Sequence, residues 1–471
     1  MQILPDDIWL EVFSFLSLKD LLGAGLVCRT WHRLSRDCSL WYNLDLEPFA
    51  RSLRSDVITR LINTVFAPSG RHLNLRKNLV TTEILQNLFE SCRGLESLSL
   101  NECRLHSSER WCEFEFHQVE ALTFLDLRNS TGYAAGVENI LQKADQLQFL
   151  GLNNCISSSL LMDVLHQKSN LRILDCAQCD WVTDDSIEAV AKYCIFLESL
   201  SLEKCRNVQG RTLPVLIEQC TRLRTLIMEG TQLKDEFVEK TNWDISGIIE
   251  LNVLNCYPLS FYGLSAVLPK LKRLHYLKCA VTDEILHLVA VGFSLLEVFV
   301  LHRRYPVTVQ LVSDLLFHCP RITCLDISSI PLAFAFFESF LPVLPRLRGL
   351  SFAGNELLGT EKIIRSLGKS SIELEVLCVN YFNSASNFEI ERSFAFLFQK
   401  CKKLREVILN GLFVNSIVAS LLSLACNVYA RQDITISENK PFIVPRPRQS
   451  LDNMWGDCRK GLFFGESKRL A

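Results

Sequence analysis

The sequence lacks a long apolar run. No stretch reaches the ~18 consecutive apolar residues that a transmembrane helix needs. The best candidates, residues 332–344 and 417–426, are interrupted or too short. The first residues also lack a basic stretch followed by an apolar one, so we expect no signal peptide.

An excess of one charge is missing too. The chain has 50 Lys and Arg against 52 Asp and Glu, which gives a net charge of −2. A strong charge bias would favour nucleic acid or a membrane surface as a partner, and we expect neither. With 20 Gly, 14 Pro and 48% hydrophobic residues, the composition also excludes a collagen-like or largely disordered chain.

Catalytic and cofactor motifs are absent or incomplete. Gly368-Lys369-Ser370 resembles the end of a P-loop, but Ile363 stands where the first glycine of that loop should be. The segment 263–267 lacks the last glycine of a nucleophile elbow, and no histidine spacing is typical of a metal site. We therefore expect no catalytic residue, no metal and no cofactor, and hence a protein that is not an enzyme.

What the sequence does contain is a repeat with apolar residues at offsets 0, 3 and 5. Leu95, Leu98 and Leu100 are one example, followed by Cys103 at offset 8. The first positions of the units are 70, 95, 122, 147, 171, 197, 223, 248, 271, 296, 322, 347, 374 and 404. At these three offsets only Gly70 is not apolar, counting Cys and Tyr as apolar. A steady period of 23 to 30 residues indicates a repeat architecture.

The spacing predicts one short strand and one helix in each unit. Side chains at offsets 3 and 5 point to the same face of a strand because they are two residues apart. Between strands, Thr183-Asp184-Asp185 caps a run whose apolar residues recur every three or four positions. Since neither element can bury its apolar face alone, we predict an α/β fold, a right-handed solenoid with parallel inner strands and outer helices.

This pattern resembles the cysteine-containing leucine-rich repeat over roughly residues 70–412. The triplet beginning at Trp41 predicts a further strand before it, and the segment around Ile436 predicts one after it. We therefore assign residues 47–439 to a leucine-rich-repeat solenoid of about 14–16 repeats.

Most of the 19 cysteines fall on two positions of the repeat. Those at offset 8 are Cys103, Cys155, Cys179, Cys205, Cys256 and Cys279. Those at offset −3 are Cys92, Cys194, Cys220, Cys319 and Cys401. Cys176 and Cys179 have the spacing of a zinc or redox pair, but both lie in the repeat frame, so we expect packed thiols instead. So many cysteines without a secretion signal favour reduced thiols and a cytoplasmic or nuclear location.

Residues 1–46 do not fit the repeat and predict three short helices. Pro5 suits the first helical position, and two aspartates follow in the positive first turn. Ser17 begins a second helix like a capping box. One interpretation of this segment is a cap for the solenoid. The other is a docking unit for a partner, because so small a unit cannot bury all its aromatic side chains by itself.

The same segment resembles an F-box. It has the Leu4-Pro5 start, the Val27-Cys28-x-x-Trp31 centre and a Leu-Trp end at residues 40–41. With the repeats, the chain resembles the F-box/leucine-rich-repeat family. The positions that match the adaptor-facing part of the motif are Leu4, Pro5, Ile8, Val12, Leu16, Val27, Cys28 and Trp31. Spacing does not tell which of them face a partner and which hold the helices together.

The resemblance implies the substrate-recognition subunit of a Skp–cullin–F-box E3 ubiquitin ligase. The F-box would bind the Skp adaptor and, through it, the cullin and RING subunits, while the repeats would bind a protein target for ubiquitination. The alternative is a leucine-rich-repeat scaffold or regulatory binding protein without a degradative role. A third hypothesis is an F-box protein that binds the adaptor without leading to degradation of a target.

The concave face, meaning the strand face turned away from the helices, is the default binding surface of a solenoid. Side chains at offsets 2, 4 and 6 point to it. Our candidate substrate-binding residues there are Phe124, Asp126, Phe149, Asp175, Glu203, Glu229, Glu250, His275 and Val300. The first seven units from Leu95 are acidic, with Arg128 as the one base on this face. A solvated, mixed strand face is the alternative.

Two segments fit no repeat frame. Residues 440–471 form a tail with three prolines, several bases and the aromatic residues Trp455, Phe463 and Phe464. The tail is either disordered or docked, and the acidic concave stretch is one docking site that its charge would fit. Residues 111–116 form an insert that predicts a strand-like excursion on the convex side.

Overall fold

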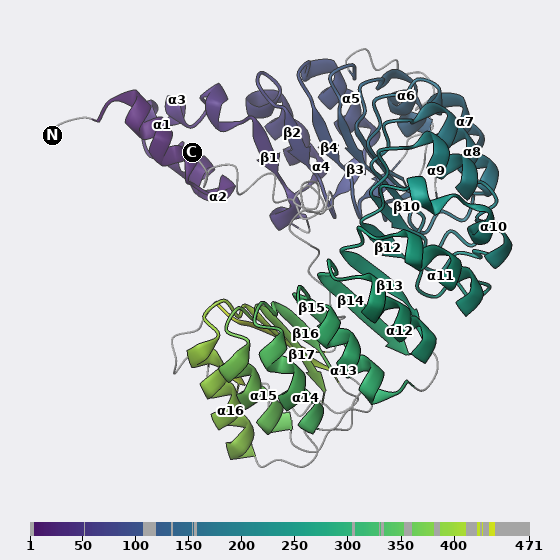
Figure 1. The fold of residues 1–471 in the computed structure, drawn as a ribbon. Helices are drawn as coiled ribbons and strands as arrows, with labels where there is room; N and C mark the ends of the chain where they lie inside the picture. Colours follow the sequence, from purple (N-terminus) through teal and green to yellow (C-terminus); the bar gives the residue numbers. More distant parts are fainter. Residues whose placement is uncertain are drawn as a thin grey trace. The chain divides into compact units, whose positions relative to one another are not determined.

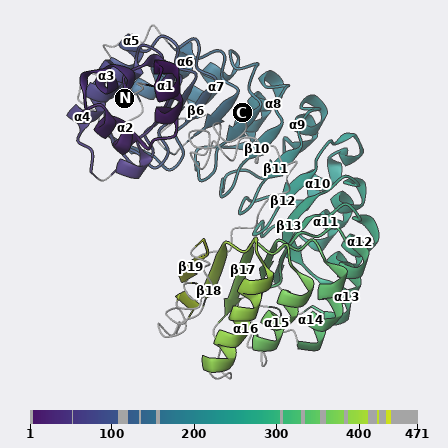
Figure 2. The same cartoon turned by 90° about the vertical axis from the view of Figure 1, so that its left-hand side faces the viewer.

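The computed structural model covers residues 1–471. It describes residues 4–50, 52–106, 119–132, 135–152, 154, 158–303, 307–328, 330, 334–352, 360–380, 387–410, 422–423, 426 and 433–438. The chain divides between Leu223 and Arg224 into two compact units, here called unit 1 and unit 2. In each of them, parallel strands line one side and helices line the other (Figures 1 and 2).

Unit 1 contains a main parallel sheet and a second, smaller one. The main sheet has the order β1 (Asn43–Asp45), β2 (His72–Asn74), β4 (Ser97–Ser99), β6 (Phe124–Asp126), β8 (Phe149–Gly151), β9 (Ile173–Asp175) and β10 (Ser199–Ser201). The second sheet has the order β3 (Leu79–Thr81), β5 (Arg104–His106) and β7 (Thr131–Gly132). Each strand of the second sheet follows a main strand after a short turn, which the repeat frame did not predict.

The first three helices of unit 1 stand before its sheet, and the others follow the strands of the repeats. The first three are α1 (Asp6–Ser14), α2 (Leu18–Ala24) and α3 (Arg29–Leu34). The others are α4 (Ser55–Leu61), α5 (Thr82–Ser91), α6 (Ala135–Lys143), α7 (Ser158–Leu165), α8 (Asp184–Tyr193) and α9 (Leu213–Gln219). Short helical turns are η1 (Cys38–Leu40), η2 (Glu47–Phe49) and η3 (Ile62–Phe66).

Unit 2 continues the same strand–helix alternation. Its strands pair in chain order: β11 (Thr225–Ile227), β12 (Glu250–Asn252), β13 (Tyr276–Val281), β14 (Val298–Arg303), β15 (Cys324–Asp326), β16 (Gly349–Ser351), β17 (Val376–Asn380), β18 (Glu406–Asn410) and β19 (Thr435–Glu438). Its helices are α10 (Asp235–Lys240), α11 (Phe261–Val267), α12 (Asp283–Gly292), α13 (Val309–His318), α14 (Phe334–Phe340), α15 (Thr360–Ser370) and α16 (Asn387–Lys400). The turns η5 (Trp243–Ile245), η6 (Leu268–Lys270) and η7 (Leu341–Val343) complete it.

Strand pairing confirms the repeat frame. The residue at offset 3 lies opposite its counterpart in the next unit, as Leu73 does with Leu98 and Leu226 with Leu251. All four side chains are buried. Burying a leucine contributes about 1.5–3 kcal/mol, so this row of residues is a principal stabilising feature of each unit. The two outlying strands are confirmed as well, as β1 and β19.

One frame is wrong by three residues. Strand β13 pairs with β12 so that Leu277 lies opposite Leu251, and the unit therefore begins at Leu274 rather than Leu271. The error arises because Leu271, Leu274 and Tyr276 also satisfy the apolar offsets 0, 3 and 5. Leu271 in fact lies at offset −3, buried at the end of the preceding helical segment.

The repeat cysteines that the structure describes are buried thiols, and several of them bond to the preceding repeat. Cys155 lies outside the described residues. At offset 8, the Sγ atoms of Cys103 and Cys205 donate to the carbonyl oxygens of Leu75 and Cys176, at 2.9 and 3.0 Å. Each acceptor is the offset-5 residue of the preceding unit. In the corrected frame Cys279 leaves this group, because it lies at offset 5 and belongs to the strand core.

Offset −3 forms a second series of such bonds at the helix ends. Cys220 Sγ donates to the carbonyl of Cys194, and Cys319 Sγ to that of Phe293, each at 3.5 Å. Each acceptor lies at offset −3 of the preceding unit. The two carbonyls also accept from the backbone N–H groups of Leu197 and Leu296, each at 3.0 Å. The thiol thus supplies a second hydrogen bond at the helix end, which links consecutive repeats.

A turn at offset 7 follows many of the strands. Lys77, Glu102 and Gln178 all adopt a left-handed conformation there, with φ of 63°, 56° and 65°. The backbone N–H of Lys77 donates to Asn101 and that of Glu102 to Arg128 in the next repeat, at 3.0 and 2.9 Å. These inter-repeat hydrogen bonds offset the cost of the conformation.

The predicted helix caps are present. Thr183 and Ser186 form a capping box at the start of α8, and Thr282 Oγ1 accepts from Ile285 N at 3.4 Å in α12. In addition, Asp184 accepts from two backbone N–H groups of the next repeat, at Gln209 and Gly210, both at 2.9 Å. The start of one helix therefore also fixes the following repeat.

Two sequence predictions lie outside the described residues. These are the excursion at residues 111–116 and the tail at residues 440–471, with its docking on the acidic concave stretch, so both stay predictions. Across the described ranges, no helix is long and apolar enough to cross a membrane.

Candidate functional site

The first three helices pack around an aromatic centre. Trp31 of α3 lies 4.8 Å from Trp9 and 5.3 Å from Phe13 of α1, measured between ring centroids. Phe13 is buried, as is Trp41, whose Nε1 donates to the carbonyl of Ser35 at 2.8 Å. Aromatic contacts of this kind add ~0.5–1.5 kcal/mol beyond burial, so Trp31 holds the helices together.

Polar contacts fix the same three helices. Arg33 pairs with Asp6 at 2.6 Å, which ties α3 to α1. The Nδ1 atom of His32 lies 2.9 Å from the carbonyl oxygen of Gly25, just after α2. A Cβ atom at Gly25 would meet Ser35 Oγ at 2.6 Å, so this glycine allows α2 to approach that serine closely.

Side-chain caps occupy the starts of α2, as predicted, and of α3. Ser17 Oγ accepts from Asp20 N at 3.2 Å at the start of α2. Cys28 Sγ accepts from Trp31 N at 3.4 Å at the start of α3. Pro5 is the N-cap of α1 rather than its first residue. Of the candidate adaptor residues, Cys28 and Pro5 are therefore exposed but also structural, while Leu16 and Trp31 are only partly exposed.

The exposed apolar side chains of α1 form one row. Leu4, Ile8 and Val12 are 45, 43 and 43% exposed, and Phe15, at the C-cap, is 70% exposed. Ile8, Val12 and Phe15 follow one another at spacings of four and three, which place them along one side of the helix. Leu4 lies just before the N-cap Pro5. Apolar residues grouped like this mark an interaction surface.

The region around α2 adds further exposed apolar side chains. Leu22 is 41%, Leu26 86% and Val27 65% exposed. Val27 was predicted from the motif, whereas Leu22, Leu26 and the Phe15 of α1 were missed. Only their exposure distinguishes them, because leucine and phenylalanine in a helical segment are more often core residues.

On the concave face of unit 1, the candidate residues Phe124 and Phe149 form an apolar cluster with Ile173. The rings of Phe124 and Phe149 are stacked with centroids 4.2 Å apart, and Ile173 continues the row on the next strand. All three are at most 4% exposed. The three side chains lie together, but in this structure they are buried.

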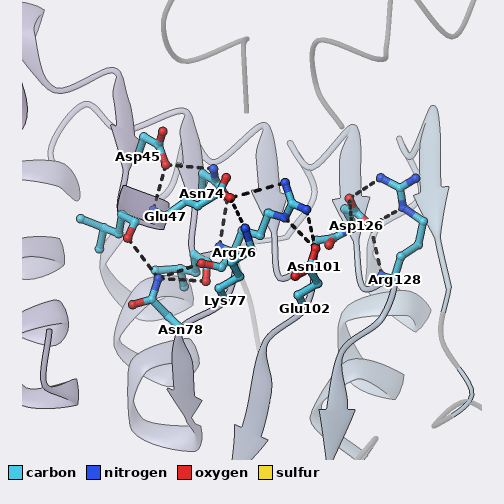
Figure 3. A network of polar contacts seen from close by, with 12 residues as sticks. Asp45, Glu47, Asn74, Arg76, Lys77, Asn78, Asn101, Glu102, Asp126 and Arg128 are labelled. Atoms are coloured by element: carbon cyan, nitrogen blue, oxygen red, sulfur yellow. Dashed lines mark hydrogen bonds and ion pairs between the residues drawn. The ribbon is translucent and has the colours of Figure 1, made fainter. Parts of the chain in front are cut away.

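Arg128 and Asp126 lie at one end of the neighbouring polar network (Figure 3). It donates to both carboxylate oxygens of Asp126, at 2.8 and 2.7 Å, and to Asp175 at 3.0 Å. The guanidinium carbon also lies 5.5 Å from the centroid of the Phe149 ring. Burial by itself would lower the pKa of Arg128, but the carboxylates of Asp126 and Asp175 raise it, so the charge persists at any ordinary pH. Two acids of the predicted acidic stretch are therefore already paired.

The network extends toward the first strand through polar and charged side chains. Asn101 Nδ2 donates to Asp126 at 3.1 Å. Arg76 forms ion pairs with Glu102 and Glu47, and Lys77 also pairs with Glu47 at 2.9 Å (Figure 3). These links cross several repeats, so they brace the sheet edge of unit 1.

Among the other candidates, Glu203 forms an ion pair with Lys204 at 3.0 Å on unit 1. In unit 2, Glu229 pairs with Lys278 at 2.8 Å and accepts from Asn252. The base Lys278 occupies the concave offset 4 only in the corrected frame. Glu250 and Val300 are on the concave face but 3 and 5% exposed.

The placement of His275 on the concave face is wrong. In the corrected frame it lies at offset 1, just before β13, and its Nδ1 is 2.9 Å from Glu297 Oε1. The reason for assigning it to substrate binding disappears with the three-residue shift.

Cys176 and Cys179 are both buried. Burial raises the pKa of the Cys176 thiol, which disfavours the thiolate that a metal requires. No group of three or more His, Cys, Asp or Glu suited to a metal ion occurs within the described residues.

Comparisons with known proteins agree on the first helices. Residues 1–47 match the family model described as F-box-like, so the chain carries an F-box-like domain at this end. F-box/LRR-repeat protein 21 of Mus musculus is 24% identical over 51% of this chain and 55% of its own length. F-box/LRR-repeat protein 12 of Homo sapiens is 29% identical over 21% of this chain and 32% of its own length. These relatives support the assignment of this chain to the F-box/leucine-rich-repeat family.

Lysine-specific demethylase 2B of Mus musculus is 25% identical over 48% of this chain but only 16% of its own length. The chain thus spans between about a sixth and about half of these curated relatives. Among solved structures, the complex of Rad7 and Elc1 from yeast contains a chain that aligns with 80% of this one and is itself covered to 89%, at 16% identity and a TM-score of 0.49.

Proposed function

We propose that this chain is the substrate-recognition subunit of a Skp–cullin–F-box E3 ubiquitin ligase. The F-box-like domain binds a Skp-family adaptor, which links it to cullin and RING subunits. The repeats bind a protein target, and the chain itself is not catalytic. It acts in the cytoplasm or the nucleus, where thiols stay reduced.

The observation that carries this proposal is the exposed row of Leu4, Ile8, Val12 and Phe15. On α1 itself, Trp9 and Phe13 pack against Trp31, whereas the side chains of the row are exposed. If the three helices served only to cap the repeats, they would not have to expose so much apolar surface to solvent. An adaptor that covered the row would bury it, and burial supplies ~25 cal/mol per Å².

Val12 and Val215 give a matched test of the adaptor surface. They are exposed to nearly the same extent, 43 and 40%, and each lies in a helix, α1 and α9. The Val12→Asp variant should lose co-purification with a Skp adaptor by at least tenfold, since a truncated or charged anchor at an interface centre often costs ≥ 2 kcal/mol. The Val215→Asp variant should keep it. Equal adaptor binding by both folded variants would sink the adaptor assignment.

A second measurement separates the ligase receptor from a scaffold. Cullin and RING subunits should co-purify through the adaptor, and a protein bound to the repeats should gain ubiquitin in the reconstituted complex. A chain that binds the adaptor while its bound protein gains no ubiquitin and keeps its half-life would support the non-degradative alternative.

A further inference from the structure

A band of unit 2 connects the ends of its helices to the following strands. It consists of offsets −5 to −1 in the units that begin at Leu274, Leu296, Ile322 and Leu347. We name these positions the basic edge. Helices α11 to α14, whose ends lead into it, pack side by side along the unit (Figures 1 and 2).

The basic edge carries charge of one sign. Its positions contain Lys270, Lys272, Arg273, Arg321 and Arg346 and no Asp or Glu. The whole chain has almost equal numbers of acids and bases, so the bias is local. Lys272, Arg273, Arg321 and Arg346 are exposed and form no ion pair with another described residue.

The helix dipole explains only part of this charge. A cation in the last turn of a helix is favoured by the negative end of the dipole, but the effect falls off beyond that turn. The turn η6 ends at Lys270, so Lys272 and Arg273 lie past it. Arg321 likewise lies past the end of α13 at His318. Lys272, Arg273 and Arg321 therefore gain little from a helix dipole, and their clustering needs a different reason.

Two exposed apolar side chains lie on the same edge. Val291 is 76% and Phe317 52% exposed. Both are at offset −5, near the C-terminal ends of the neighbouring helices α12 and α13. Packed helices lie ~8–10 Å apart, so the two side chains are neighbours rather than isolated residues. Exposed apolar groups that adjoin one another mark a contact surface.

We propose that the basic edge binds an acidic segment of a partner protein in an extended conformation. Apolar side chains of that segment cover Val291 and Phe317, and its carboxylates pair with Arg273 on one side and Arg321 and Arg346 on the other. An extended chain advances ~3.3 Å per residue, so residues three apart span ~10 Å. This matches the separation of the two helices.

A protein segment fits this surface better than a nucleic acid does. The unit that contributes Val291 has no cation at offsets −5 to −1, so a phosphate backbone following the edge would cross apolar surface there. A peptide that alternates acidic and apolar residues satisfies both features. The proposal does not depend on the F-box assignment, because it concerns unit 2 alone.

The test uses the full chain and a defined probe. The probe is a fluorescent 12-residue peptide that repeats Glu-Glu-Leu, with a Lys-Lys-Leu peptide and a single-stranded oligonucleotide as comparisons. The double variant Arg273→Glu/Arg321→Glu should weaken binding of the acidic peptide about tenfold. The Phe317→Ser variant should weaken it about threefold without changing the charge. Raising the salt concentration should weaken the wild type more than the double variant.

A control variant carries the same change of net charge at other places. Arg206→Glu/Lys234→Glu reverses two exposed cations that do not belong to the basic edge, and it should bind the acidic peptide within twofold of the wild type. Equal losses in both double variants would reduce the effect to net charge and overturn the proposal. So would tighter binding of the oligonucleotide than of the peptide, or no effect of Phe317→Ser.

Discussion

Arg128 lies directly over Gly151. A Cβ atom on this glycine would come within 2.9 Å of Arg128 Cγ and 2.7 Å of Asp126 Oδ1. Gly151 is on β8, between Asp126 on β6 and Asp175 on β9. The arginine therefore spans three strands because the middle one has no side chain in its way.

The first prediction concerns this glycine. Gly151→Ala should destabilise the protein by about 1–3 kcal/mol, because the methyl group forces either Arg128 or Asp126 from its place. Gly23→Ala is the matched control, since a Cβ atom there meets nothing within 4 Å, and alanine favours the helix by up to ~1 kcal/mol. Thermal unfolding of both variants checks the pair. A tolerated alanine at position 151 would show that the arginine can cross the strand by another path.

The sequence predicts the repeat well but not the register of every unit. Offsets 0, 3 and 5 can be read because each unit must bury the same three side chains. Around Leu271 two frames satisfy that rule, and only the strand pairing between Leu251 and Leu277 decides between them. That pairing depends on contacts between distant residues, which a local pattern does not contain.

In the candidate sites too, the sequence predicts what depends on local spacing and misses what depends on contacts between distant residues. The F-box motif identifies residues such as Val12 and Trp31, but one is exposed and the other holds the helices together. Asp126 and Asp175 are 49 residues apart in the sequence, and their shared partner Arg128 becomes visible only when the strands are aligned. The pattern could predict that they face the same way, but not that they are already neutralised.

The second prediction concerns thiol reactivity. Burial raises the pKa of Cys103 and of Cys205 to about 12, so at pH 8 they are almost wholly protonated and shielded. Cys28 and Cys38 are exposed. A thiol reagent at pH 8, followed by peptide mapping, should modify these two within minutes and leave Cys103 and Cys205 intact until the protein unfolds. Rapid modification of Cys205 in the native protein would contradict its place in the repeat core.

The third prediction concerns zinc. Cys176 is buried in the strand core, so turning its side chain toward a metal would disrupt the packing of the repeat. Elemental analysis of the purified, reduced protein should find clearly less than one zinc per chain. Stoichiometric zinc that is lost in a Cys179→Ser variant would show that the pair with Cys176 binds metal after all.

The last prediction concerns a lysine in an apolar position. Lys168 lies at offset −3, where other repeats have Cys194, Cys220 or Cys319, and its side chain is fully buried. Its Nζ pairs with Asp145 at 3.0 Å, while Asp145 itself is 57% exposed. Removing an ammonium group from water is costly, and desolvation lowers the pKa of Lys168 despite the carboxylate.

The Lys168→Met variant keeps the volume and removes the charge, so we expect it to be more stable than the wild type by about 1 kcal/mol at pH 7. The pKa of Lys168 is lower in the folded state than in the unfolded state. Between these two values the unfolded chain binds more protons, so the stability of the wild type rises with pH there. The advantage of methionine should therefore shrink as the pH rises from 7 toward 10.

Lys204→Met is the control, because Lys204 also pairs with a carboxylate at 3.0 Å but is 54% exposed. The difference in stability between this variant and the wild type should stay within ~0.5 kcal/mol at each pH. Unfolding curves at pH 7, 8.5 and 10 decide the matter: a Lys168→Met variant that is less stable at pH 7, or whose advantage grows with pH, would mean that the ion pair with Asp145 outweighs the burial of the charge.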